Sequence, residues 1–279
     1  MNESIVTFGR NHNLCGIVNR KQHSRLHSPA IIILNSGLIN KPGPFGLNTR
    51  LARKIAEQGF IVLRFDLSGI GDSPKHADNR DRHQQIIGDV KDAMDMLQSN
   101  YGVQTFIAMG ICAGADNTHR IMSEDERLSG AIFLDGYAYP TLKYQLIKHR
   151  YHALNPLYWL KAGLAPFLNI PKLFHQQQTT QQASQANLFW SLPPKRQFQS
   201  DLIHAVEHNV QLLYIFSGGE QLCLYKNQFQ DSFPDINFGD QLQVDIMPDA
   251  HHLFVTEEER EELTHKIICW LQQKFNPPQ

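Results

Sequence analysis

The feature that most constrains the fold of this chain is a regular alternation of short apolar runs with helical patterns. Continuous apolar runs occur at 30–34, 60–65, 105–109, 131–134 and 210–216, with a further strand pattern at 242–246. Helical spacing of apolar residues occurs at 46–58, 83–99, 113–124, 221–229 and 257–274. Continuous apolar runs are typical of strands buried on both faces. The alternation therefore predicts βαβ crossovers and an α/β fold, with a mostly parallel central sheet and helices on both faces.

Two segments depart from this rhythm. Residues 3–9 and 14–19 alternate apolar and polar positions around a turn, which predicts an antiparallel hairpin. Residues 137–209 are rich in aromatic residues and prolines, and they interrupt the series between two strands. We expect residues 1–279 to form a single domain, with 137–209 inserted as a helical cap or lid.

The composition of the chain argues against several classes of protein. Lys and Arg total 26 against 27 Asp and Glu, and this near-neutral balance argues against a nucleic-acid partner. No run reaches the roughly 18 apolar residues of a membrane span, and no secretory signal is visible at the N-terminus. The four cysteines lack CxxC spacing, which favours a reduced, cytoplasmic location over a disulfide framework. The expected partner is a small molecule.

The sharpest local pattern is Gly110–Gly114, with the sequence Gly-Ile-Cys-Ala-Gly, between a predicted strand and a predicted helix. Glycines at both ends permit a tight strand–turn–helix junction that pushes Cys112 into the open. A helix N-terminus favours a thiolate through its unpaired N–H groups and its dipole. We therefore predict Cys112 as the nucleophile.

A thiolate nucleophile needs a base, and the base needs an orienting acid. His251 and His252 follow the last predicted strand, so they belong to the edge of the sheet where the Cys112 turn lies. Glu220 is the first choice as the acid and Asp135 is a serious rival, because each follows a predicted strand. Asp249 is a weaker third candidate for the acid.

The site also needs donors for an oxyanion. The backbone N–H of Ala113, directly after the nucleophile, is one candidate. The second is expected in the loop after the first parallel strand, from Gly37 or Leu38.

These segments together give a resemblance to the α/β-hydrolase superfamily over nearly the whole chain. They are Asn35–Gly37, the stretch 66–73 that resembles a D-x-x-G-x-G-x-S segment, Gly110–Gly114, and His252 with Leu253 and Phe254. More narrowly, Asn35–Pro44 and Gly110–Cys112 resemble hydrolases associated with exosortase and exopolysaccharide gene clusters. The resemblance implies an α/β-hydrolase fold and, through its His-x-Phe ending, favours His252 over His251.

The chain also departs from the superfamily pattern. Cys112 stands where serine is usual, Ser36-Gly37 replaces a His-Gly pair, and Glu220 stands near the place of the usual Asp. Because superfamily members place the acid in either of two loops, the choice between Glu220 and Asp135 stays open.

The predicted activity is hydrolysis of an ester or thioester through a Cys-His-acid triad and an acyl-enzyme. Two alternatives are an acyltransferase that uses the same Cys112 and a non-catalytic binding or regulatory protein of the same fold. No cofactor is expected. No metal is expected either, although His204 and His208 match a H-x-x-E-H zinc pattern, because no third protein ligand is evident nearby. Cys15 and Cys269 lie in strand and helix patterns and are predicted to be core residues. Cys223, three residues after Glu220, is predicted to be a packing residue, with a place near the site as the alternative.

Overall fold

The computed structural model describes residues 1–22, 28–76, 80–153 and 192–275. Its strands are β1 (Asn2–Phe8), β2 (Leu14–Arg20), β3 (Ala30–Ile33), β4 (Val62–Asp66), β5 (Phe106–Ile111), β6 (Leu128–Leu134), β7 (Gln211–Ser217) and β8 (Leu242–Met247). Its α-helices are α1 (Leu47–Glu57), α2 (Arg82–Tyr101), α3 (Ala113–Met122), α4 (Leu142–Ala153), α7 (Lys195–Glu207), α8 (Gln228–Ser232) and α9 (Glu257–Lys274).

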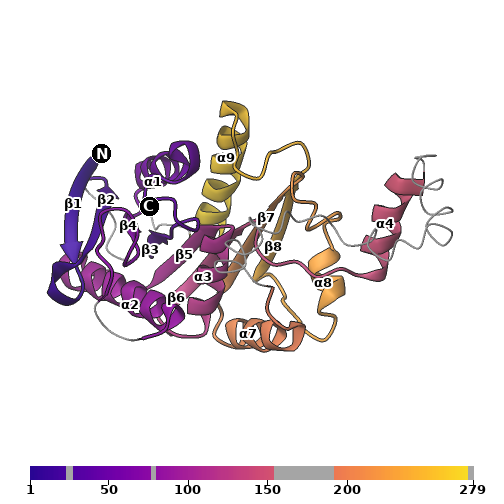
Figure 1. The fold of residues 1–279 in the computed structure, drawn as a ribbon, viewed down its shortest axis with the longest axis horizontal. Coiled ribbons are helices and arrows are strands. Elements are labelled where there is room, and N and C mark those ends of the chain that lie inside the picture. The colour runs from indigo at the N-terminus through magenta and orange to yellow at the C-terminus, as the bar shows by residue number, and fades with distance from the viewer. Residues whose placement is uncertain (23–27, 77–79, 154–191, 276–279) are drawn as a thin grey trace, which may run out of the picture.

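The strands form one twisted sheet in the order β1-β2-β4-β3-β5-β6-β7-β8 (Figure 1). The predicted hairpin is confirmed, since β1 pairs antiparallel with β2. β2 also runs antiparallel to β4, whereas every pairing from β4 through β8 is parallel. The carboxyl ends of the parallel strands therefore share one edge, which is where open α/β sheets place their sites.

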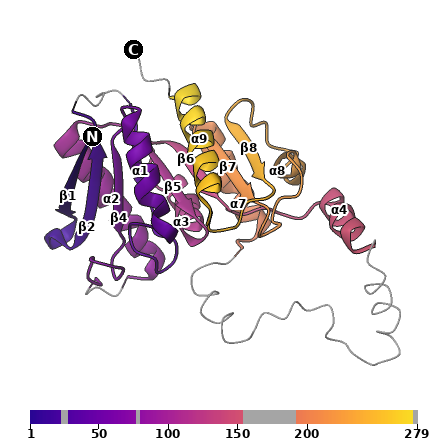
Figure 2. The same cartoon turned by 90° about the horizontal axis from the view of Figure 1, so that it is seen from above.

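Helices cover both faces of the sheet, as the alternation predicted. α1 and α9 lie on one face, and α2, α3 and α7 lie on the other (Figures 1 and 2). The α1 and α9 face buries Leu51, Ile55 and Trp270 against alternate residues of the central strands. This apolar burial fixes the strand edge and the loops that rise from it.

The predicted helix over 221–229 is wrong in most of its length. Residues 221–227 form turns and bends, and helix α8 begins only at Gln228. The Gln228 side chain donates to the Leu222 carbonyl (2.9 Å) and accepts from the Leu224 N–H (2.8 Å), so it satisfies the backbone of a loop. Gln221 also has a φ of +50°, which a helix cannot contain.

The predicted insertion 137–209 is described at its two ends only, because 154–191 lie outside the described residues. α4 projects from the side of the molecule (Figures 1 and 2). α7, in contrast, buries Phe198, Leu202 and Ala205 in the core, so it belongs to the layer of helices that covers the sheet.

All three cysteine predictions can be compared with the described structure. Cys15 lies in a strand, as predicted, but is only partly buried in β2. Cys223 is buried among apolar side chains, as expected of a packing residue. Cys269 is exposed on α9, so its prediction as a core residue was wrong: it lies on the solvent side of an amphipathic helix. No helix within the described ranges has the length and apolar character needed to cross a membrane.

Candidate active site

The turn at Cys112 joins β5 directly to α3 and has the strained geometry that its glycines predicted. Cys112 has φ +53° and ψ −120°, a conformation that side chains rarely adopt. A Cβ atom at Gly110 would lie 2.2 Å from the Gly114 carbonyl group, and one at Gly114 would lie 2.8 Å from the Asn35 carbonyl oxygen. Both positions therefore require glycine, and the turn holds the half-buried Cys112 at the N-terminus of α3.

His252 approaches Cys112 from the loop that follows β8. Its Nδ1 lies 2.7 Å from Asp135 Oδ2, and Cys112 is a second neighbour that acts on the imidazole and raises its pKa. Because Nδ1 faces Asp135, Nε2 is the nitrogen left for the thiol. The structure thus brings Cys112, His252 and Asp135 together in one series, in which His252 is hydrogen-bonded to Asp135.

His251 does not take part in this series. Its backbone N–H donates to Glu259 Oε1 (2.8 Å), and its Nδ1 accepts from the Leu253 N–H (3.1 Å). The side chain of His251 therefore serves its own loop at the start of α9.

Asp135 follows β6 directly and is fully buried. It is held with a φ of +49°, which is uncommon for a residue other than glycine. Ser217, at the end of β7, donates to Asp135 twice: its N–H to Oδ1 and its hydroxyl to Oδ2, both at 2.6 Å. With His252 this makes three donors to one buried carboxylate, which is how a buried charge is accommodated.

Glu220 lies near the same imidazole but in a different setting. Its Oε1 is 3.9 Å from His252 Nδ1, beyond hydrogen-bond distance, and its side chain is 47% exposed. Asp249 is exposed as well, in the loop before His252. Of the three acids that the sequence offered, Asp135 is the one in contact with His252.

The electrostatics of His252 follow from these neighbours. Burial lowers its pKa, but the hydrogen bond to Asp135 and the interactions with Asp135 and Cys112 raise it more. The net effect moves the His252 pKa from its usual 6.5 to about 10. The imidazole therefore holds its proton at neutral pH.

The candidate oxyanion donors lie on both sides of the turn. Ala113 begins α3 directly after Cys112. Gly37 has φ +58° in the loop after β3, and Leu38 beside it is 67% exposed. The next amide along, that of Ile39, already donates to the Ser36 carbonyl (3.0 Å). Parallel pairing of β3 with β5 brings this loop beside the Cys112 turn.

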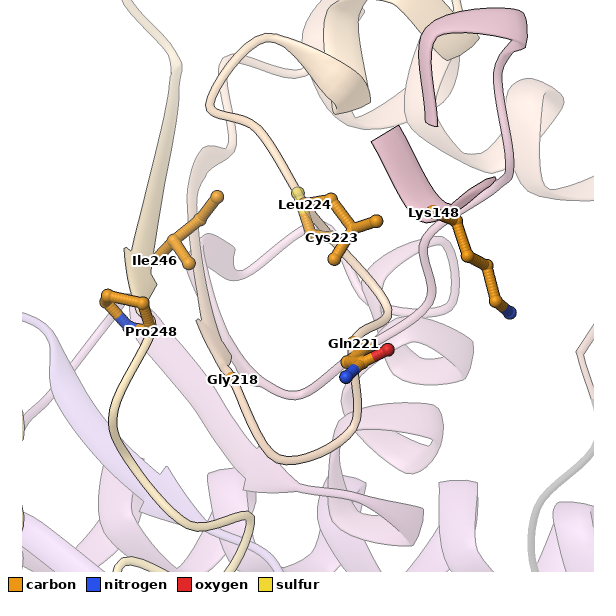
Figure 3. A pocket seen from close by; sticks show the side chains of 7 residues that line it. All are labelled: Lys148, Gly218, Gln221, Cys223, Leu224, Ile246 and Pro248. Carbon is orange, nitrogen blue, oxygen red and sulfur yellow. The ribbon is translucent and has the colours of Figure 1, made fainter. Parts of the chain in front are cut away.

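A pocket of about 330 Å³ opens beside this site, between the loops that follow β7 and β8 (Figure 3). Cys223, Leu224, Ile246 and Pro248 give it apolar walls, and Lys148 and Gln221 lie at its rim. It adjoins the triad through the loop 218–220, since a Cβ atom at Gly219 would lie 3.1 Å from the His252 nitrogen. Burial raises the pKa of the Cys223 thiol to about 11, so this second cysteine is a packing residue of the wall.

The two histidines of the zinc pattern, His204 and His208, contact each other on α7 and its C-terminal end. The two rings stack on each other at 4.0 Å between centroids, and His208 Nδ1 bonds to the His204 carbonyl (2.8 Å). Among the residues that the structure describes, no group of three or more His, Cys, Asp or Glu side chains could hold a metal ion.

Sequence reasoning missed Ser217. It is a polar residue at the end of an otherwise apolar strand, and β7 neighbours β6, which ends at Asp135. A search for polar residues at the carboxyl ends of neighbouring strands would have found it.

Sheet order, helix placement and the strand–turn–helix site define an α/β-hydrolase fold. The model of the family described as Serine aminopeptidase, S33 (Hydrolase_4) matches residues 27–217, and the chain belongs to this family. It is an enzyme of the α/β-hydrolase class. No curated protein matches the chain.

Solved structures similar to this chain have the same fold. The Pyrococcus furiosus esterase Pf2001 is 16% identical, with a TM-score of 0.64, over 98% of this chain and 92% of that one. The α/β hydrolase GrgF from Penicillium sp. sh18 is 16% identical, with a TM-score of 0.63, over 99% and 100%. XC6422 from Xanthomonas campestris, an α/β serine hydrolase without lid, is 15% identical, with a TM-score of 0.58, over 100% and 97%. At sequence identities of 15–16%, the similarity to these structures shows a shared fold and no more.

Proposed function

We propose that this enzyme hydrolyses carboxylic esters or thioesters through an acyl-thioester on Cys112. The observation that carries the proposal is the convergence of three groups at the carboxyl edge of the sheet. Cys112 lies in its strained turn at the N-terminus of α3, and His252, whose pKa Cys112 raises, bonds to Asp135 (2.7 Å). A nucleophile, a base in reach of it and a carboxylate that orients the base make up the arrangement for acyl transfer.

In the first half of the reaction, Cys112 Sγ attacks the carbonyl carbon and the carbonyl oxygen takes the negative charge. The N–H of Ala113 and that of Gly37 or Leu38 stabilise this oxyanion. The bond to the leaving alcohol or thiol then breaks, and His252 Nε2 gives its proton to the leaving group. An acyl-thioester remains on Cys112.

In the second half, His252 Nε2 takes a proton from water, and the oxygen attacks the thioester carbonyl. The C–S bond breaks, the acid is released, and the proton returns to the Cys112–His252 pair. Asp135 holds Nδ1–H throughout, which keeps Nε2 directed at the reacting atoms. Cysteine replaces the serine that gives the family its description, and the raised pKa of His252 suits a thiolate–imidazolium pair.

The acyl group that fits this site best is apolar. Leu38 is 67% exposed beside its own candidate N–H donor, and Phe45, in the same loop, is 63% exposed. Gly43, Phe45 and Gly46 all have positive φ, so the loop turns sharply around this exposed ring. Exposed apolar side chains at a site favour an apolar ligand.

The experiment is steady-state turnover of a panel of esters and acyl thioesters from two to twelve carbons, with Cys112→Ala beside it. We expect turnover that rises with chain length and is abolished in Cys112→Ala. Phe45→Ser should flatten the chain-length profile, whereas Ile5→Ser, a matched change at an exposed apolar residue of β1, should leave it unchanged. Equal turnover in Cys112→Ala would contradict the proposal.

Product analysis with added alcohols and amines separates hydrolysis from acyl transfer. Free acid as the main product, with little change on adding acceptors, is the expected result. An acylated acceptor as the main product would identify an acyltransferase that uses the same Cys112.

A further inference from the structure

The loop from Asn35 to Lys41 carries the second candidate oxyanion donor. A buried ion pair between Lys41 and Asp66 anchors the end of this loop. An oxyanion donor acts only if its N–H stays in place while charge develops on the substrate. Yet this loop is not a helix or a strand, and Leu38 near its centre is largely exposed. Something besides regular secondary structure must therefore hold Gly37 and Leu38.

The group beneath the loop is the carboxylate of Asp66, at the end of β4, which is fully buried. Its Oδ1 accepts from Asn35 Nδ2 (3.2 Å) and from the Lys41 backbone N–H (2.6 Å). Its Oδ2 accepts from Lys41 Nζ (2.7 Å) and from the Asp72 N–H (3.1 Å). One carboxylate thus binds both ends of the loop.

Asn35 and Lys41 reinforce this closure. Asn35 Nδ2 also donates to the Ile39 carbonyl (2.9 Å), and Asn35 Oδ1 accepts from the Leu67 N–H (2.8 Å). The Lys41 side chain is 9% exposed, and its Nζ also bonds to Asp72. Burial alone lowers the Lys41 pKa, but the hydrogen bonds to Asp66 and Asp72 outweigh it and raise the pKa.

The stretch 66–73, which the sequence resemblance singled out, builds the frame around this carboxylate. A Cβ atom at Gly71 would lie 2.3 Å from Asp66 Oδ2, so only glycine fits there. The Ser73 hydroxyl donates to the Asp66 carbonyl (2.6 Å) and accepts from the Cys15 N–H (2.9 Å). The frame is thereby joined to strand β2.

The loop also touches the nucleophile turn. Gly114 packs so closely on the Asn35 carbonyl that a Cβ atom there would lie 2.8 Å from its oxygen. Asn35 therefore bonds to Asp66 through its side chain and packs on the Cys112 turn through its carbonyl group.

We propose that Lys41 and Asp66 are positioning residues of the oxyanion hole, whose buried ion pair holds the Gly37–Leu38 amides toward the substrate carbonyl. This role rests on the proposed function, since it presupposes an acyl transfer at Cys112. A buried ion pair is weak evidence for added stability, because desolvation offsets the attraction. The buried Lys41 is better explained by its effect on the loop, which it holds in one conformation.

The test compares two reactions of the same thiol in Lys41→Met. Acylation of Cys112 by a thioester forms an oxyanion, whereas alkylation by iodoacetamide displaces iodide at a saturated carbon and forms none. Both rates are read by mass spectrometry of the peptide that contains Cys112, which separates it from the other cysteines. Lys54→Met, at an exposed lysine of α1, is the matched control.

We expect acylation by Lys41→Met to fall by roughly 10- to 100-fold, somewhat less than the loss of one oxyanion donor. Alkylation should stay within about twofold of the wild type, because it forms no oxyanion, and the control should match the wild type in both reactions. Asp66→Asn should show the same selective loss. If Asp66→Asn does not fold, the test is made with Lys41→Met alone.

Two results for the variants overturn the inference alone. A parallel loss of acylation and alkylation would mean that the pair supports the fold or the Cys112 turn in general. Unchanged acylation would mean that the loop keeps its conformation without the Lys41–Asp66 ion pair. Absence of acylation in the wild-type protein, with alkylation intact, would instead refute the proposed function, and this inference with it.

Discussion

The loops that follow β6 and β7 each present a carboxylate to the same histidine, and they do so in opposite ways. Asp135 is fully buried, has a positive φ and accepts from Ser217 twice and from His252. Glu220 is half-exposed and 3.9 Å from the same nitrogen. The buried carboxylate has a fixed position and few water competitors, whereas the exposed one is screened by solvent. Orientation of a catalytic base thus depends on how an acid is held as well as on how near it lies.

The largest expected effect comes from removing the charge of the buried acid. Asp135→Asn should lower kcat/KM by roughly 10²- to 10⁴-fold, because an amide leaves His252 without the partner that fixes its tautomer. Steady-state kinetics on one ester, with circular dichroism to confirm folding, measures this. A loss below about threefold would remove Asp135 from the mechanism.

Ser217 should have the next largest effect. Ser217→Ala removes one of the donors to Asp135 but keeps its backbone N–H bond, so we expect a loss of roughly 10-fold in kcat/KM, in line with about 1.5 kcal/mol for a hydrogen bond to a charged group. Ser232→Ala, another buried serine with two hydrogen bonds, is the control and should leave kcat/KM unchanged. Equal losses in both variants would assign the effect to packing.

The pH dependence tests how Asp135 acts on His252. The His252 pKa is raised to about 10, so the imidazolium is present below that pH and is lost above it. For an alkyl ester, whose leaving group needs the proton, kcat/KM should fall as pH rises through about 10. In Asp135→Asn this fall should move to lower pH. If the fall in kcat/KM occurs at the same pH in Asp135→Asn, a group other than His252 causes it.

The smallest effect is expected at the exposed acid. Glu220→Gln should change kcat/KM by less than about threefold, as is usual for exposed charge pairs, and raising the salt concentration should reduce the difference further. A large loss of kcat/KM in Glu220→Gln, with Asp135→Asn still active, would contradict this account and make Glu220 the acid.

Much of the fold could be predicted from the sequence, because buried strands and amphipathic helices carry strong local patterns. The glycines of the Cys112 turn and the placement of His252 after the last strand are of this kind. The segment 221–227 could not be predicted, because the Gln228 side chain replaces the helix bonds that the pattern suggested.

The acid was the harder part of the site. Glu220 and Asp135 both follow strands, and nothing local separates them. The separation comes from neighbouring strands: β6 lies beside β7, so Ser217 reaches Asp135, although the two are 82 positions apart in the sequence. The closure of the loop from Asn35 to Lys41 by Asp66 is non-local in the same way, since the parallel pairing of β3 with β4 creates it.

The central claim is that Cys112 forms the acyl-enzyme, and rapid-quench mass spectrometry tests it most directly. Wild-type protein would be mixed with an acyl thioester, quenched in acid within the first turnover, digested and mapped, with Cys112→Ala treated alike. The account predicts a transient acyl mass on the peptide that contains Cys112, formed and lost at rates compatible with turnover and absent from the variant. Turnover without that adduct, or an adduct that persists in Cys112→Ala, would contradict it.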